Sequence, residues 1–326
     1  MQISEIGANA LIERLTALFP ESDTRDDAAL FELKGTGVTS THLMLEGVHF
    51  DLRYMPVHHL GYKAVATTLS NLAAMNATPT HISVAIGVTA QWEVEDLETL
   101  YKGIRIAAER FGVKLLGGDT APSVAGFTIA VTAIGYADPE KVVRRKGAAP
   151  NDLICVSGNL GAAYMGLKAL EREQEAYDGS SDYKHDLGGR TYLLERQLTP
   201  QPRFDILDML SLAGVKPTSM IDITKGIARD LLTLSQASGV GMKLYEERLP
   251  IDYETASMAE EIGINVFSAA LYGGEDYELL FTVPLGLKDV MEQMEGIAIV
   301  GYATEAAAPA LLVTQDGREV ELKEQE

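Results

Sequence analysis

Strand-like and helix-like segments alternate along most of this chain, and that order limits the folds available to it. Apolar residues recur at helical spacing over residues 57–77 and 93–112, and the second run closes with Gly112, where a helix end is expected. Strand-like segments follow or separate these helices at residues 81–89, 114–120 and 127–137. This alternation predicts an α/β or α+β fold.

The strand-loop-helix pattern starts again over residues 153–173, after a basic segment. We therefore place a domain boundary at about 138–150, which predicts an N-terminal domain of residues 1–140 and a C-terminal α/β domain of residues 141–326.

Three local features complete the expected organisation. Residues 1–20 show helical spacing, and residues 31–50 alternate like a β-hairpin turning around Gly35 to Gly37. Residues 175–189 are polar and rich in glycine and serine, which predicts an exposed loop.

The charge of the chain limits its partners. It has 47 acidic and 27 basic residues, a formal charge of −20, which repels nucleic acids and anionic membrane surfaces. We expect no nucleic-acid or membrane partner. A polyanion that binds a phosphorylated small molecule must invert its own field locally, with divalent cations or a few Lys and Arg residues.

The single cysteine and the hydropathy pattern point to a cytoplasmic protein. Cys155 lies among apolar residues and is expected to be a thiol in the core rather than a nucleophile. No apolar run approaches the roughly 20 residues of a membrane span, and the first residues are unlike a signal peptide.

Acidic residues recur beside glycines or hydroxyls at the ends of expected strands. The four instances are Asp26-Asp27, Gly117-Gly118-Asp119-Thr120, Asp222-Ile223-Thr224 and Gly273-Gly274-Glu275-Asp276. Glycine lets a phosphate approach the backbone, and a carboxylate beside it can hold Mg²⁺. The same residues are also common turn formers, so each fragment alone leaves both interpretations open.

Two residues near these fragments suggest binding chemistry. Lys225 follows the third fragment and suggests phosphate handling, although the loop glycines of a Walker P-loop are missing. His49 is either a half-buried strand histidine or a donor to a substrate. A zinc site and a serine hydrolase are not expected, because the chain has no HExxH motif and no G-x-S-x-G motif.

Taken in order, the motifs resemble the thiamine-monophosphate kinase family of the aminoimidazole-ribonucleotide synthetase superfamily. The matching segments are "DDAAL", "LEGVHF", "GYKAVATTLSNLAAM", "GGDT", "RRKGAAPNDLICVSG", "DITKGI" and "GGEDYELLFTV". The resemblance implies two α/β domains and a homodimer formed through the N-terminal domain, with active sites near the dimer interface. It also implies ATP-dependent phosphorylation of thiamine monophosphate to thiamine diphosphate, with Mg²⁺ ions bridging the phosphates.

The resemblance assigns roles residue by residue. It implies metal ligands at Asp27, Ser40, Thr41, Asp119 and Asp222. It implies nucleotide contacts at Gly118, Asp119, Arg145 and Thr224, and substrate contacts at His49 and Glu275. Asp119, Asp222 and Lys225 are the candidate catalytic residues.

The chain departs from the family pattern in the metal cluster. His42, Asn71 and Lys225 stand where the family has aspartates, and Arg25 replaces a glycine. These changes add about five positive charges, roughly the charge of two or three Mg²⁺ ions. We therefore expect fewer bound metal ions than in the family.

Three functions remain open from the sequence. The first is a working thiamine-monophosphate kinase with fewer metal ions, and the second is a nucleotide- or phosphate-binding homologue with weak or no catalysis. The third is phosphoryl transfer to another substrate on the same scaffold.

Overall fold

A computed structural model describes residues 3–20, 28–29, 31–32, 34–177 and 188–323. Its contacts divide the chain into two compact units, and residues 73–76 group with the second unit together with residues 141–326. Each unit has its own sheet, so the mixed α/β class predicted from the alternating segments is confirmed. No helix in the described part of the chain is long and apolar enough to cross a membrane.

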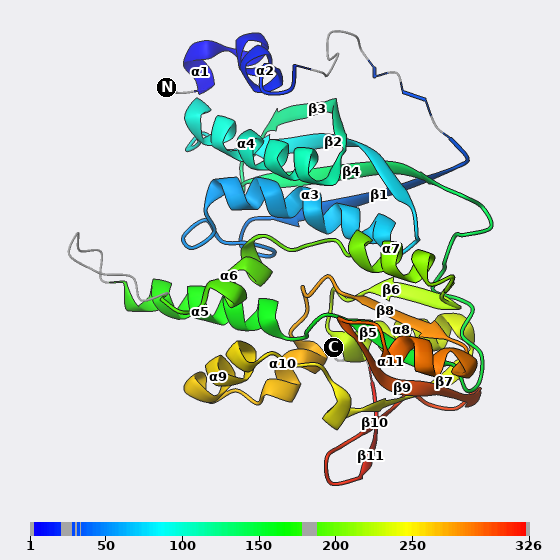
Figure 1. The fold of residues 1–326 in the computed structure, drawn as a ribbon. Helices are drawn as coiled ribbons and strands as arrows, with labels where there is room; N and C mark the ends of the chain where they lie inside the picture. The colour runs from blue at the N-terminus through cyan, green and yellow to red at the C-terminus, as the bar shows by residue number, and fades with distance from the viewer. Residues whose placement is uncertain (1–2, 21–27, 30, 33, 178–187, 324–326) are drawn as a thin grey trace. The chain divides into compact units, whose positions relative to one another are not determined.

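The first unit contains a four-stranded sheet with the strand order β1-β4-β2-β3. Its elements are α1 (Ile3–Ile6), α2 (Ala8–Thr16), β1 (Thr36–Leu45), α3 (Val57–Ala73), β2 (Thr78–Val88), α4 (Val94–Phe111), β3 (Lys114–Pro122) and β4 (Thr128–Ala137). Strands β2 and β3 are parallel, and β4 is antiparallel to both β1 and β2. Helices α3 and α4 cover one face of the sheet (Figure 1).

The two faces of this sheet differ in exposure. The residues that face the helices, such as Ile82, Val84 and Val131, are buried. The residues on the other face alternate with them and are half-buried or exposed, and the side chain of Leu43 is 47% exposed. We call this second face the open face of the sheet.

Two sequence predictions in the first unit can be compared directly with the structure. Helix α4 ends at Phe111, and Gly112 adopts the left-handed conformation, as predicted. The predicted hairpin over residues 31–50 is wrong. Residues 36–45 form the single strand β1, which pairs over its whole length with β4, about 90 residues further along the chain. Alternation identifies a strand but not its partner.

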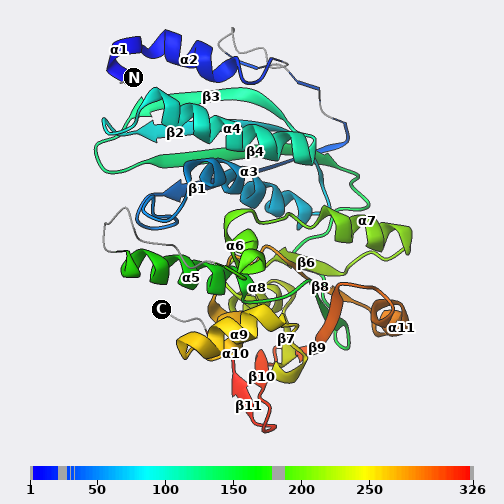
Figure 2. The ribbon, with the colours of Figure 1, turned by 60° about the vertical axis from the view of Figure 1, so that its left-hand side comes forward.

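The second unit contains a seven-stranded sheet with the order β11-β10-β7-β9-β5-β8-β6. Its strands are β5 (Leu153–Ser157), β6 (Ser219–Asp222), β7 (Val240–Tyr245), β8 (Leu279–Val283), β9 (Ile297–Ala306), β10 (Leu311–Val313) and β11 (Glu319–Glu321). Its helices are α5 (Ala162–Ala176), α6 (Thr191–Leu198), α7 (Phe204–Leu212), α8 (Ile227–Ser238), α9 (Tyr253–Ile262), α10 (Val266–Tyr272) and α11 (Lys288–Glu292), with short 3-10 turns η1 (Glu246–Arg248) and η2 (Leu285–Leu287). Figure 2 shows these elements after a 60° turn.

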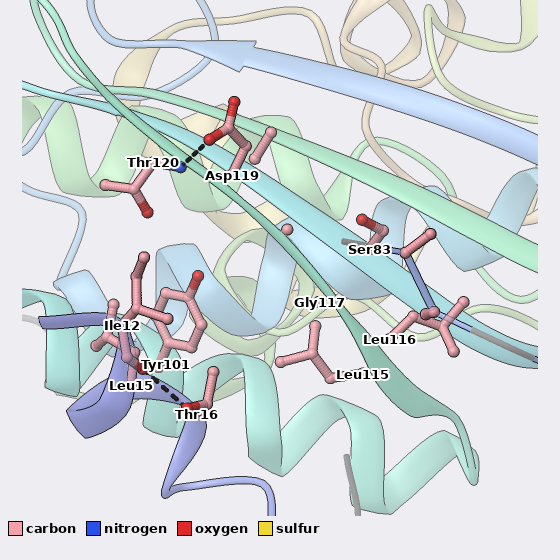
Figure 3. Close-up of a pocket in the computed structure, with 14 residues that line it drawn as sticks. Ile12, Leu15, Thr16, Ser83, Tyr101, Leu115, Leu116, Gly117, Asp119 and Thr120 are labelled. Carbon is pink, nitrogen blue, oxygen red and sulfur yellow. Dashed lines mark hydrogen bonds between the residues drawn. The ribbon is translucent and has the colours of Figure 1, made fainter. Parts of the chain in front are cut away.

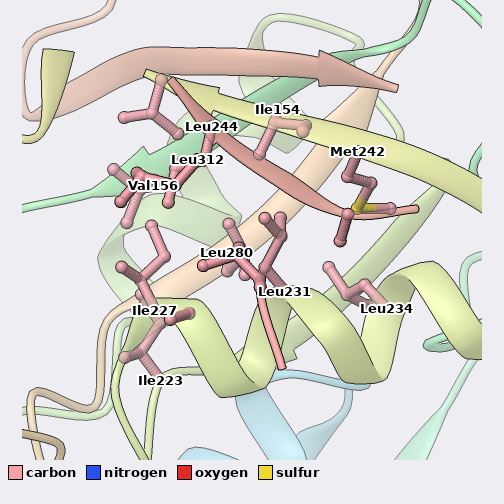
Figure 4. Packing of buried hydrophobic residues seen from close by; sticks show 14 of the residues in the cluster. Ile154, Val156, Ile223, Ile227, Leu231, Leu234, Met242, Leu244, Leu280 and Leu312 are labelled. Atoms are coloured by element: carbon pink, nitrogen blue, oxygen red, sulfur yellow. The ribbon is translucent and has the colours of Figure 1, made fainter. Parts of the chain in front are cut away.

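Apolar side chains cover both faces of the central strands of this sheet. On one face, residues of α8 pack against the strands, as Figure 4 shows for Ile227, Leu231, Leu234, Ile154, Val156 and Leu280. On the other face, Ile206 and Leu210 of α7 and Met291 of α11 pack against the sheet. This burial on both sides explains why β5 and β8 are mostly apolar, with one buried hydroxyl residue each, Ser157 and Thr282.

Cys155 belongs to this core, as predicted. Its side chain is fully buried in β5, and burial raises the pKa of the thiol to about 12. The thiol is therefore protonated at neutral pH and is a poor nucleophile.

Candidate active site

The Gly118-Asp119 pair lies where β3 packs closely against β2. A Cβ atom on Gly118 would lie 1.6 Å from the carbonyl oxygen of Val84, so only glycine permits this approach. The next residue, Asp119, is exposed, and its Oδ1 accepts a hydrogen bond from the backbone N–H of Thr120 at 2.8 Å. The glycine thus serves strand packing, and the carboxylate beside it remains accessible to a ligand.

A cavity of about 640 Å³ adjoins Asp119 in the first unit. Figure 3 shows its lining side chains. One part is apolar and is formed by Ile12 and Leu15 of α2 together with Tyr101 of α4. Another part carries polar atoms of Ser83, Asp119 and Thr120. The cavity therefore offers both an apolar surface and hydrogen-bonding groups to one ligand.

Tyr101 is a wall of this cavity that the sequence analysis did not identify. Its ring packs edge-to-face against Phe19, with the ring centroids 6.4 Å apart. Burial raises the pKa of its hydroxyl to about 12, so the side chain is neutral at physiological pH. Nothing in the spacing of α4 distinguishes Tyr101 from the other apolar residues on the same helix face.

The candidate metal ligands Ser40 and Thr41 point to opposite faces of β1, because successive strand residues alternate. Thr41 lies on the open face, where its hydroxyl hydrogen-bonds to that of Thr132 at 2.8 Å. Ser40 lies on the same face as His42, whose Nδ1 lies 3.0 Å from Oγ1 of Thr67 on α3. The imidazole that stands in place of a family aspartate is thus hydrogen-bonded to a helix.

Thr41 and Asp119 share the open face but lie on opposite edge strands. Three strand spacings separate β1 from β3, and Asp119 lies two residues beyond Gly117, the residue of β3 in the same row as Thr41. Together these offsets place Thr41 and Asp119 roughly 16 Å apart. Within one chain, these two residues therefore cannot bind the same ion.

His49 lies in the turn after β1. Its Nδ1 accepts a hydrogen bond from the backbone N–H of Leu45 at 3.1 Å, which leaves the proton of the neutral ring on Nε2. The ring stands edge-on to that of His42, with centroids 6.2 Å apart. Nε2 of His49 can therefore donate a hydrogen bond, the role expected for it toward a substrate.

In the second unit, three candidate residues, Thr224, Lys225 and Glu275, lie in loops at one end of the sheet. β8 lies between β5 and β6 and runs antiparallel to both, so its first residue is beside the last residues of the other two. The loop after β6 carries Thr224 and Lys225, and the loop before β8 carries Glu275. The backbone N–H of Glu275 donates to the carbonyl of Thr224 at 3.0 Å, which joins the two loops.

Asp222 is buried at the last position of β6, whereas the side chain of Lys225 is exposed. Burial raises the pKa of the Tyr277 hydroxyl well above its usual value, and the negative charges of Glu275 and Asp222 raise it further. The structure therefore places Asp222, Thr224, Lys225 and Glu275 at the same end of the second sheet, and the separate roles that the resemblance implied for them stay predictions.

Asp230, which the sequence analysis missed, binds the backbone of the loop after β6. Its Oδ2 accepts hydrogen bonds from the backbone N–H groups of Thr224 at 2.8 Å and Lys225 at 3.0 Å. Burial raises the pKa of Asp230 to about 6, and the two amide donors oppose that shift. An aspartate in the first turn of a helix is common, so nothing in the sequence around Asp230 indicates this role.

Arg145 is not close to this group of residues. Its carbonyl accepts a hydrogen bond from Ser238, at the far end of α8, while the Lys225 loop precedes the first residue of α8. A 12-residue helix is about 18 Å long. The structure does not bring Arg145 to Thr224 in the second unit, and its assignment to the nucleotide site stays a prediction.

The described residues contain no cluster of three or more side chains that could hold a metal ion by themselves. The candidate metal ligand Asp27 lies outside the described residues, so this absence does not extend to it. Mg²⁺ is commonly held by one or two carboxylates, with substrate phosphates and waters as the other ligands. Exposed Asp119 fits that mode of binding, in which the ion accompanies a phosphate.

Comparisons with known proteins match this chain over nearly its whole length. Residues 25–137 match the family model of the AIR synthase related protein, N-terminal domain. Thiamine-monophosphate kinase of Methanospirillum hungatei is 33% identical over 93% of this chain and 93% of its own. The corresponding enzyme of Synechococcus elongatus is 30% identical over 93% and 90%.

Solved structures give the same result. Thiamine monophosphate kinase of Aquifex aeolicus superposes with a TM-score of 0.75 at 30% identity, covering 98% of this chain and 100% of that chain. A structure of AaThiL complexed with AMPPCP and TMP superposes with a TM-score of 0.74 at 29% identity, covering 98% and 97%.

Proposed function

The chain belongs to the thiamine-monophosphate kinase family, and from this premise we propose that it transfers the γ-phosphoryl group of ATP to thiamine monophosphate. An oxygen of the monophosphate attacks the γ-phosphorus, the bond to the β-phosphate oxygen breaks, and ADP and thiamine diphosphate leave. The similarity of the whole chain to a structure complexed with AMPPCP and TMP carries this proposal.

We assign ATP to the cavity beside Asp119. Its volume of about 640 Å³ is in the usual range for such ligands. The apolar part formed by Ile12, Leu15 and Tyr101 would take the base, and the part near Gly118 and Asp119 would face the phosphates.

Mg²⁺ would accompany the nucleotide, neutralising charge on the phosphates as phosphoryl transfer proceeds. Asp119 would hold the ion in the first unit, and Asp222 is the corresponding carboxylate of the second unit. Lys225 adds a cation on an exposed side chain close to Asp222, and it would supply part of the charge that the family takes from metal.

The charge of Glu275 suits the other substrate. The thiazolium ring of thiamine carries a positive charge, and a carboxylate is its natural partner. Glu275 is the group of the second unit that we assign to thiamine monophosphate, and the Nε2–H of His49 is the candidate donor that the first unit offers.

A second copy of the chain would complete the site at the open face of the four-stranded sheet. The side chain of Leu43 on this face is 47% exposed. One row across the four strands contains, in order, Leu43, Ala130, Ala85 and Asp119. Because Thr41 and Asp119 are too far apart to act together in one chain, a homodimer through this face could supply one from each copy. Location in the cytoplasm stays a prediction from the sequence.

The test is to incubate the purified chain with ATP, Mg²⁺ and thiamine monophosphate and to separate the thiamine phosphates by chromatography. We expect thiamine diphosphate to form, and chelation of Mg²⁺ to reduce its formation. A chain that gains thermal stability from ATP but forms no diphosphate at high protein concentration would instead be a binding homologue.

A further inference from the structure

A buried ion cluster lies behind the loop that carries Glu275. Glu278, only 1% exposed, pairs through Oε1 with Nη1 of Arg196 at 2.8 Å and through Oε2 with Nη1 of Arg203. The hydroxyl of Ser157 donates to the same Oε2 at 2.5 Å. Two arginines from different segments, α6 and the turn before α7, therefore share one carboxylate.

The two arginines differ in their other contacts. Arg203 also pairs with the exposed Asp205, through Nε at 2.9 Å and Nη2 at 2.8 Å. Arg196 uses Nη2 to donate to two backbone carbonyls, that of Asp276 at 2.9 Å and that of Asn159 at 3.2 Å. Arg196 thus joins the buried Glu278 to the backbone of two loops, whereas the second partner of Arg203 is an exposed side chain.

The loop that Arg196 contacts has an unusual backbone. Glu275 has φ 58° and Tyr277 has φ 52°, in the left-handed region that residues other than glycine seldom adopt. Such a conformation persists only when its surroundings hold it. Arg196 holds the carbonyl of Asp276, the residue between them, while the Asp276 carboxylate accepts a hydrogen bond from the backbone N–H of Gly161 at 3.0 Å.

We propose that Arg196 is a positioning residue for thiamine monophosphate: its guanidinium, fixed by Glu278, holds the Glu275 loop in its left-handed conformation and so presents the Glu275 carboxylate to the substrate. This inference rests on the proposed function. Arg203 is the second cation at Glu278, its charge is balanced by Asp205, and in this proposal it does not position the loop.

The test compares Arg196→Lys with Arg203→Lys in the full chain. Each variant keeps the positive charge and loses the guanidinium geometry at the same carboxylate, but only the first also loses the bonds to the two loop carbonyls. We expect Arg196→Lys to raise the KM for thiamine monophosphate about tenfold or more while the KM for ATP changes less than about twofold. Arg203→Lys should change neither constant by more than about twofold.

A merely structural role for the cluster predicts a different pattern, in which both variants lower the melting temperature and affect both substrates alike. That result would overturn the inference while the activity of the wild-type chain supports the proposed function. A wild-type chain that neither binds nor phosphorylates thiamine monophosphate would overturn both.

Gly274→Ala displaces the same loop by another route and serves if Arg196→Lys does not fold. Gly274 has φ 75°, and its Cβ would lie 2.7 Å from the carbonyl oxygen of Thr224. It leaves the side chains around Glu278 unchanged. We expect the same selective rise in the KM for thiamine monophosphate, and an unchanged KM would show that the loop position does not matter.

Discussion

The carboxylate of Asp230 accepts a hydrogen bond from the backbone N–H of Lys225 at 3.0 Å, which ties the loop after β6 to the first turn and a half of α8. The side chain of Lys225 is exposed, while its backbone N–H is bound to this buried carboxylate. The buried Asp230 therefore fixes the backbone position of Lys225, the residue that stands where the family has an aspartate.

Asp230→Asn should change how stability depends on pH. Burial raises the pKa of Asp230 from 3.8 to about 6, so the folded state binds the proton more tightly than the unfolded chain between these values. The stability that this group contributes is present below about pH 4 and is lost as the pH rises through about 6. Asparagine keeps an oxygen acceptor for both amides but does not titrate.

Denaturant unfolding at pH 4 and pH 7.5 checks this prediction. The free energy of unfolding of Asp230→Asn, relative to wild type, should rise between these values by roughly 3 kcal/mol. Asp208→Asn, at an exposed position on α7, serves as the control and should follow wild type. A relative stability of Asp230→Asn that is constant with pH would contradict the raised pKa.

Lys225→Asp should increase the Mg²⁺ dependence of nucleotide binding. The substitution removes an exposed cation near Asp222 and adds a carboxylate that can ligate the ion. Titration calorimetry with a non-hydrolysable ATP analogue, with and without Mg²⁺, measures the effect, and we expect the ratio of the two affinities to rise about tenfold. Lys323→Asp makes the same charge change after β11 and should leave that ratio at its wild-type value. If both variants behave like wild type, Lys225 does not lie at the nucleotide.

The features that the sequence predicted correctly are those determined by nearby residues. The apolar spacing of α4 and the left-handed Gly112 at its end depend on a few adjacent positions. The partner of β1 depends on β4, and the hairpin prediction failed because strand alternation carries no information about that distant pairing.

The candidate site shows the same division. Motif order brought out Asp222, Thr224, Lys225 and Glu275, which the fold gathers at one end of the second sheet. The supporting residues, such as Arg196, were missed because their role comes from buried contacts between segments about 80 residues apart. Composition and spacing do not report such contacts.

Gly118→Ala should destabilise the first unit. The added Cβ would lie 1.6 Å from the carbonyl oxygen of Val84, and a backbone atom cannot rotate away as a side chain can. We expect a loss of about 3 kcal/mol in the free energy of unfolding and loss of ATP binding. Gly286→Ala is the matched control, because its Cβ meets no atom within 4 Å. Equal stability of the two variants would mean that β2 and β3 can separate at this point without cost.

Leu43→Glu should separate a dimer that forms through the open face of the four-stranded sheet. Leu43 is 47% exposed on this face. In a two-fold dimer, a carboxylate at this position would lie near the same carboxylate of the second copy, and both negative charges would lose their water on association. Light scattering after size-exclusion chromatography should give about twice the chain mass for wild type and about the chain mass for the variant.

Kinase activity should fall with the dimer, since Thr41 and Asp119 lie on opposite edge strands of the sheet and one chain cannot bring them together. Leu212→Glu makes the same change on α7, where the side chain is 89% exposed, and should leave both mass and activity unchanged. A Leu43→Glu variant that stays dimeric would place the interface elsewhere, and one that is monomeric and fully active would show that a single chain holds the complete site.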